Sequence, residues 1–330
     1  MMKHLFLAAL TATLAALSPI SFPGGETGIG FDDLGFAPTL HRVLVPGGRT
    51  GKLILIDPET HTTEMISGFT QGTEYGGGHG EGITSADEGP GAIFVTDRSS
   101  KRLNVVDEQS RKIVATAPLG AGPDYVRFVA ETNEVWVTEP HAQGIEVFAL
   151  PASGTPRPVH SGFIEVPGGP EALVIGHSQK RAYTNLWSDT SVVIDPRERK
   201  VISRWSNGCK GSRGLALDAE HGLLFVGCEE GKVSILATAD GRQLGQASSG
   251  AGVDIIAYNL KRAHLYLPGG ASATMATIQV AADGKASVLG TVSTASGSHC
   301  VTTDGRDHVY VCDPRRGRIL VFEDSLPASK

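Results

Sequence analysis

A short strand-like segment recurs seven times along this chain of 330 residues. Its copies read LILID, LNVVD, IEVFA, SVVID, VSILA, TIQVA and ILVFE, and they begin 42 to 50 residues apart, from Leu53 to Ile319. About ten residues before each copy lies a second such segment, for example IFVTD or VYVCD. Both kinds alternate apolar with small or polar residues, which is the period of a β-strand. Turn clusters such as DRSSKR and CEEGK join each pair into a predicted hairpin.

Two further strands complete the repeating unit. Segments such as TTEMIS and VISRW follow the hairpins, and segments such as GEGITSADEG precede them. A four-stranded unit of about 43 residues has the size of a β-propeller blade, and blades stacked around an axis cover one another's faces. We therefore predict an all-β fold, a seven-bladed β-propeller of four-stranded antiparallel blades. The last unit stops after its third strand, at Phe322, so we expect residues 22–29 to supply its outer strand.

The N-terminus has the pattern of an export signal. In residues 1–21 a lysine precedes an apolar run that is too short for a typical transmembrane span, and prolines and glycines follow it. We predict a signal peptide over 1–21, with cleavage between Ala15 and Pro23, and a single propeller domain over 22–330. That domain would be periplasmic or extracellular, with no membrane span. The formal charge of −6 argues against nucleic acid as a partner, and we expect a monomer.

The hairpins resemble those of a bacterial protein family. Phe94–Asp97 (FVTD), Trp136–Glu139 (WVTE) and Tyr183–Asn185 (YTN) are similar to the tetrapeptide of the YVTN-type repeat proteins, a group of exported seven-bladed propellers. The resemblance extends over residues 30–325. It implies the architecture and little chemistry, because most of this group has no defined activity. Function therefore has to be argued from the candidate sites.

Each blade places an ionisable group where its innermost strand is predicted to begin. These strand starts ring one mouth of the channel, and a concave mouth with converging polar groups is a typical ligand site. The candidate ligand-binding residues, including one tryptophan from a neighbouring turn, are Asp32, His79, Glu81, Asp124, Arg127, Glu171, Trp187, Arg213, Asp254 and His299. The structural alternative is that the carboxylates only tie neighbouring loops together through backbone N–H groups, with the arginines balancing their charge.

Part of this ring has the composition of a metal site. His79 and Glu81 form an H-x-E pair, whose side chains share one face if the segment is a strand. The candidate metal ligands are His79, Glu81, Glu171, Asp254 and His299. Imidazoles would suit zinc or another transition metal, whereas a set of carboxylates would suit calcium or magnesium. No other cofactor is indicated, because the chain has no haem-attachment motif.

Four cysteines occur, which in an exported chain predicts two disulfides. We expect a cross-strand bridge between Cys300 and Cys312, with Thr303 paired to Val309, and a second bridge between Cys209 and Cys228. The alternative role, a nucleophilic thiol beside His299, has less support in an exported chain. Both bridges would brace the channel mouth.

Two functions remain open at this stage, and no catalytic residue can be named for either. The first is a binding scaffold that presents the polar mouth to a protein or a small-molecule ligand. The second is a metal-dependent hydrolase or lyase, as in lactonase-type propellers, where a metal ion polarises a carbonyl group. The segment GEGITSADEG is faintly similar to the Glu-Gly-Pro motif of gluconolactonase-type propellers, but Ile83 replaces the proline. Metal content would discriminate between the two.

Overall fold

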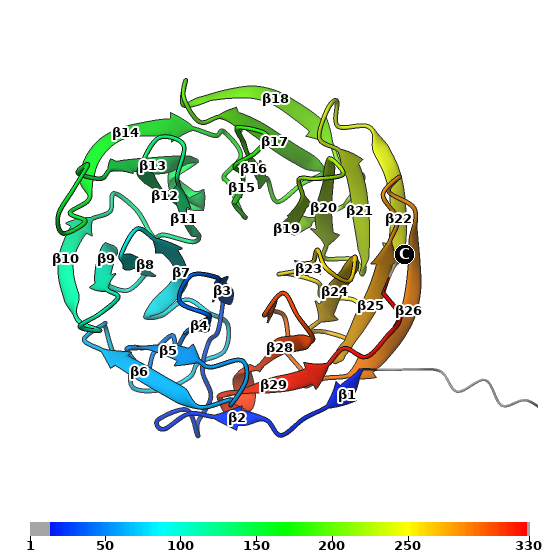
Figure 1. Ribbon diagram of the computed structural model, residues 1–330, viewed down its shortest axis with the longest axis horizontal. Helices are drawn as coiled ribbons and strands as arrows, with labels where there is room; N and C mark the ends of the chain where they lie inside the picture. Colours follow the sequence, from blue (N-terminus) through cyan, green and yellow to red (C-terminus); the bar gives the residue numbers. More distant parts are fainter. Residues whose placement is uncertain (1–13, 329–330) are drawn as a thin grey trace, which may run out of the picture.

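Seven antiparallel sheets stand around a central axis in the computed structural model, which describes residues 14–328 (Figure 1). The first three blades are β3 (Gly35–Ala37), β4 (Arg42–Pro46), β5 (Lys52–Ile56) and β6 (Thr63–Ser67); β7 (Ile83–Gly89), β8 (Ala92–Asp97), β9 (Arg102–Asp107) and β10 (Ile113–Pro118); and β11 (Val126–Val129), β12 (Glu134–Glu139), β13 (Gly144–Ala149) and β14 (Val159–Glu165). The next three are β15 (Val174–Gly176), β16 (Arg181–Asn185), β17 (Thr190–Asp195) and β18 (Lys200–Ser206); β19 (Ser212–Asp218), β20 (Leu223–Cys228), β21 (Lys232–Ala237) and β22 (Gln243–Ser248); and β23 (Ala257–Asn259), β24 (His264–Gly269), β25 (Thr274–Val280) and β26 (Ala286–Ser293). The last blade contains β27 (Val301–Thr303), β28 (His308–Asp313) and β29 (Arg318–Glu323), joined by β1 (Ala15–Ala16) and β2 (Ile20–Ser21). Two 3-10 turns, η1 (Pro140–Ala142) and η2 (Pro314–Arg316), follow β12 and β28.

The predicted fold class is confirmed: the protein is an all-β, seven-bladed propeller of four-stranded antiparallel blades. Burial explains why its strands differ in sequence. The second strands of several blades, such as β8 and β20, are buried at every residue because neighbouring sheets cover both of their faces. Outer strands such as β18 alternate exposed with half-buried residues, since only one face meets a neighbouring blade.

The last blade closes with strands from the N-terminus, but from different residues than expected. Ala15–Ala16 and Ile20–Ser21 pair antiparallel with the two ends of β29, and residues 22–29 contribute no strand. The segment after Ser21 instead leads towards the first inner strand, with Phe22, Ile29 and Phe31 buried on the way. Of the predicted signal peptide, residues 1–13 lie outside the described residues, and 14–21 pack against the last blade.

The innermost strands place two sets of loops at one mouth of the channel. One set leads from the outer strand of a blade into the inner strand of the next, and the other joins the second strand of a blade to its third. Residues from both sets meet around one cavity, as described below. Within residues 14–328, the chain forms no helix long and apolar enough to cross a membrane.

Candidate functional site at the channel mouth

A cavity of about 510 Å³ occupies the channel mouth. Seven of the ten residues expected at this mouth line it. They are His79, Asp124, Glu171, Trp187, Arg213, Asp254 and His299. They come from six blades, so only closure of the ring brings them together.

On one side of the cavity, a buried ion-pair network joins three blades. The Nη2 atom of Arg98 lies 3.2 Å from Asp32 Oδ2 and 2.5 Å from Asp124 Oδ1. Asp32 Oδ2 also lies 2.8 Å from His79 Nδ1. Burial would raise the pKa of Asp32, but His79 and Arg98 lower it below its usual value. The Asp32 carboxylate in turn raises the pKa of His79 to about 9.

Asp124 belongs to the same network but titrates differently. Burial and the neighbouring Asp32 carboxylate raise the pKa of Asp124 to about 8, although Arg98 acts in the opposite direction. One arginine is thus shared by two carboxyl groups, so the pKa of Asp32 is lowered while that of Asp124 is raised.

The opposite side of the cavity combines charge with an aromatic ring. Arg213 Nη2 lies 2.7 Å from Glu229 Oε2, and its Nη1 lies 3.4 Å from Glu171 Oε1. Trp187 donates its Nε1–H to Glu171 Oε2, and the Arg213 guanidinium lies 5.8 Å from the centre of the Trp187 ring. Burial, followed by repulsion from Asp124 and Asp254, raises the pKa of Glu171 to about 9.

Asp254 lies between these two networks and belongs to neither. Among residues 14–328, its carboxylate has no hydrogen bond and no ion pair within 4.0 Å, and burial raises its pKa. One ligand atom each from His79, Asp254 and His299 lies within 4.8 Å of the other two. The two imidazole rings are tilted against each other with their centres 5.4 Å apart. These three side chains form a compact group of potential metal ligands.

The structure separates the other expected residues from this cavity. Asp32 lies behind His79 and Arg98 and does not line the cavity itself. Arg127 forms a bidentate ion pair with Asp33, at 2.6 and 3.0 Å, and lines a different cavity of about 230 Å³.

Glu81 is exposed and lines a third cavity, of about 240 Å³, together with Arg49 and Tyr75. His79 and Glu81 were expected to share the face of a strand, but this was wrong, because β7 begins only at Ile83. Gly82 is the reason for the late start. Its φ of +72° favours glycine, and a Cβ atom there would lie 2.1 Å from the Gly48 carbonyl oxygen.

Sequence reasoning missed three ionisable residues of the cavity: Arg98, His141 and Glu229. Each follows the second strand of its blade by one or two positions, as Trp187 does. A comparison of the residues after all seven second strands would have found them. The predicted ring was composed mainly of residues at the starts of the inner strands.

Both predicted disulfides are present, and both lie next to the mouth. Cys209 and Cys228 are joined with their Cα atoms 5.2 Å apart, and Cys300 and Cys312 with theirs 5.6 Å apart. The expected pairing of Thr303 with Val309 is also confirmed. Cys312 Sγ lies 3.9 Å from His299 Nδ1, which places the second bridge beside the cavity.

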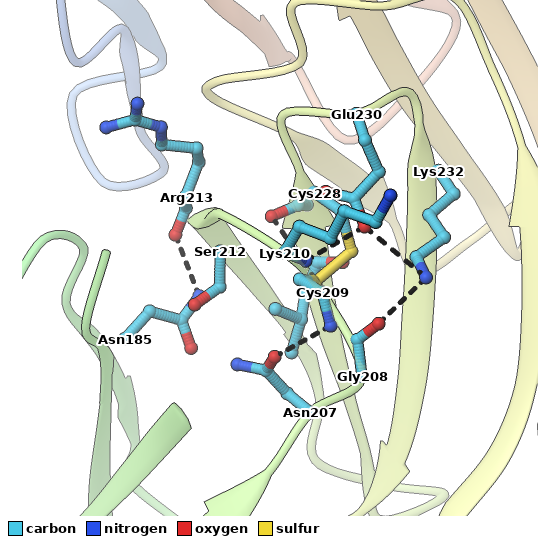
Figure 2. Close-up of a disulfide and its surroundings, with 12 residues drawn as sticks. Asn185, Asn207, Gly208, Cys209, Lys210, Ser212, Arg213, Cys228, Glu230 and Lys232 are labelled. Atoms are coloured by element: carbon cyan, nitrogen blue, oxygen red, sulfur yellow. Dashed lines mark hydrogen bonds and ion pairs between the residues drawn. A yellow bond between two sulfur atoms is a disulfide. The ribbon is translucent and has the colours of Figure 1, made fainter. Parts of the chain in front are cut away.

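The first bridge holds the loop that leads into β19, whose second residue is Arg213. Figure 2 shows Cys209 tied to Cys228, while the Arg213 side chain points away from the sulfur atoms. Asn207 Oδ1 accepts a hydrogen bond from the Cys209 N–H at 3.1 Å, and Asn185 Nδ2 donates one to the Arg213 carbonyl at 2.8 Å (Figure 2). The backbone on both sides of Arg213 is thereby fixed.

Comparison with known proteins supports the fold alone. No protein-family model matches the chain, and no curated protein matches its sequence. Among solved structures, a chain of the mitotic checkpoint complex is similar with a TM-score of 0.76 and 10% identity, over 98% of both chains. A chain of hydrazine synthase from Kuenenia stuttgartiensis has a TM-score of 0.71 and 14% identity, over 98% of this chain and 99% of that one. The Cps50 (Swd1) β-propeller domain from Myceliophteria thermophila has a TM-score of 0.73 and 11% identity, over 92% and 99%.

Proposed function

We propose that this protein is an exported propeller of the YVTN type whose channel mouth binds a small polar ligand. The observation that carries the proposal is the convergence of seven expected polar or aromatic residues on one concave space of about 510 Å³. A cavity of this size with a few fixed polar groups has the character of a small-molecule site. Export is supported by the N-terminal sequence pattern, with cleavage before the strand Ala15–Ala16 that completes the last blade, and by the two disulfides.

A small molecule fits this mouth better than a protein partner does. The carboxyl groups of Asp124 and Glu171 are buried within the cavity wall, where a flat protein surface would not reach them. The similar structures include a chain of the mitotic checkpoint complex, and that assembly is the support for a protein partner. If the outer surface of the ring bound a protein partner, substitutions of the mouth residues would not change that binding.

Ligand titration tests this proposal. The Trp187 side chain is 49% exposed at the cavity, so its fluorescence should respond when sugars, carboxylic acids or amines bind. Asp124→Asn and Glu171→Gln are expected to weaken any ligand that binds at least tenfold. Glu81→Gln, outside this cavity, is the matched control and should bind normally. The proposal fails if no member of the panel changes the fluorescence or Tm, or if Glu81→Gln weakens binding equally.

A metal-assisted hydrolase or lyase is the second candidate, and the grouping of His79, Asp254 and His299 favours it. A metal ion held there would face the same cavity and polarise a carbonyl group of a bound lactone. We expect hydrolysis of a lactone panel that is lost on chelation and in Asp254→Asn. Hydrolysis by the chelated wild type at an unchanged rate would eliminate this candidate.

A further inference from the structure

We propose that His79, Asp254 and His299 bind one divalent transition-metal ion of the zinc class, with Asp32 orienting His79 and one coordination position open to the cavity. The inference rests on the mouth being the functional site. Beyond the proposed function, it identifies the class of the ion, its three protein ligands and the residue that orients one of them. Glu81 and Glu171, which the sequence also suggested as ligands, are not part of this set.

The distances between the three donor atoms suit a single ion. Zinc binds nitrogen and oxygen ligands at about 2.0–2.2 Å, so two ligands of one tetrahedral ion lie roughly 3.4 Å apart. In this structure no two of the donor atoms of His79, Asp254 and His299 are more than 4.8 Å apart. Side-chain rotations that move each donor by about an ångström would complete the coordination.

The second nitrogen of each histidine has the partner that a metal-binding histidine needs. Such a histidine usually donates its other ring N–H to a carboxylate or a backbone carbonyl, which fixes the tautomer and the ring. His79 Nδ1 lies 2.8 Å from Asp32 Oδ2, so its Nε2 can keep a free electron pair. Asp32 is itself buried and held by Arg98, as an orienting residue should be.

His299 meets the same requirement with backbone oxygens. Its Nε2 lies 3.0 Å from the Phe31 carbonyl oxygen and its Nδ1 lies 2.6 Å from that of Gly297. An imidazole that binds a metal ion has only one N–H, so one of these two contacts is given up when the ion binds. A ring rotation that turns one nitrogen to the metal ion leaves the other nitrogen with a carbonyl acceptor.

The charges of the mouth leave Asp254 available for a cation. Arg98 is paired with Asp32 and Asp124, and Arg213 with Glu171 and Glu229. Among residues 14–328 no hydrogen bond or ion pair engages the Asp254 carboxylate. Two imidazoles and one carboxylate are a transition-metal set, since calcium requires six to eight oxygen ligands. Three protein ligands with a free position are the arrangement of catalytic zinc sites.

Zinc binding to the full chain tests the inference. We expect the chelator-treated protein to bind about one equivalent of Zn²⁺ in competition with a chromophoric chelator. Asp254→Asn and His299→Gln should weaken binding at least 100-fold, and Asp32→Asn by 10–100-fold, the range measured for residues behind metal ligands. Glu81→Gln is the matched control and should bind as the wild type does.

Replacement by Co²⁺ provides a readout that does not depend on the stability of any variant. The wild type should show the visible absorption bands of four- or five-coordinate Co²⁺, and Zn²⁺ should remove them. Less than about 0.1 equivalent of Zn²⁺ on the wild type overturns the inference, as does a Glu81→Gln variant that loses the ion. A wild type that takes up no zinc but still binds a ligand at Trp187 would refute this inference and leave the proposed binding function intact. Zinc binding without any fluorescence response to a ligand would support this inference and refute the proposed binding function.

Discussion

Arg98 is expected to be the most important single charge at the channel mouth for stability. Its side chain is 21% exposed and makes five hydrogen-bond contacts, the longest of them 3.4 Å to His79 Nδ1. It lies 3.2 Å from Asp32 and 2.5 Å from Asp124, and it donates to the carbonyl oxygens of His79 and Pro123 at 2.8 and 2.9 Å. Substitution by methionine keeps much of the volume and removes all of these hydrogen bonds. The two carboxyl groups then share a buried space without their arginine.

The magnitude follows from these contacts. Breaking a buried ion pair by removing one partner costs about 3–5 kcal/mol, and we take the lower end because water reaches part of this guanidinium. Unfolding entropy of about 2.1 cal/mol/K per residue gives roughly 0.7 kcal/mol/K for a folded unit of this length. Arg98→Met should therefore lower the Tm by about 4–5 °C at neutral pH.

Thermal unfolding followed by circular dichroism measures this effect, in buffer with a chelator. Arg102→Met, an exposed arginine with one 3.3 Å contact to Thr116, is the matched control and should lie within about 1 °C of the wild type. The pKa of Asp32 is lowered in the folded state, so its contribution is present above the unfolded pKa and lost as the pH falls through the folded value. The difference in Tm between Arg98→Met and the wild type should thus disappear as the pH falls below about 4. A neutral-pH difference no larger than that of the control would refute the reasoning.

Three further predictions concern titration, closure and the first disulfide. The pKa of Glu171 is raised to about 9, so the folded state holds a proton that the unfolded state loses near pH 4.5. The free energy of unfolding should therefore fall as the pH rises between these two values, by up to about 1.4 kcal/mol per pH unit. In a series of Tm measurements over this range, Glu171→Gln should reduce the dependence of the Tm on pH. Compared with a variant that lacks only residues 1–13, deletion of 1–21 removes the outer strands of the last blade, so it should lower the Tm and promote association through the exposed edge. Equal Tm values and monomers on size-exclusion chromatography for both variants would contradict the closure. Replacing Cys209 and Cys228 by serine opens a loop closed across a separation of 19 residues. The free energy of unfolding, measured with a denaturant, should then fall by about 3 kcal/mol. An unchanged free energy of unfolding would show that the bridge does not constrain the chain.

The sequence by itself determined the architecture, because repetition is a property that one chain displays directly. Seven copies of a strand pattern define seven blades, and the polar residues before the inner strands already indicated one mouth. The cysteine pairs were equally accessible, since hairpin register places Cys300 opposite Cys312. The need for a strand from the N-terminus also followed from the missing fourth strand of the last unit.

Only the tertiary structure decided which of these residues share a cavity. His79 and Glu81 are two positions apart and both line the smaller cavity, yet only His79 also lines the mouth cavity, because glycines hold the segment outside a regular strand until Ile83. Alternation predicts side-chain direction inside a strand and not in the loop that leads into it. Arg98 pairs with Asp32 across 66 positions of sequence, and Asp254 meets His79 only when the ring closes. No local pattern encodes such a contact, since it depends on how seven separate sheets pack around one axis.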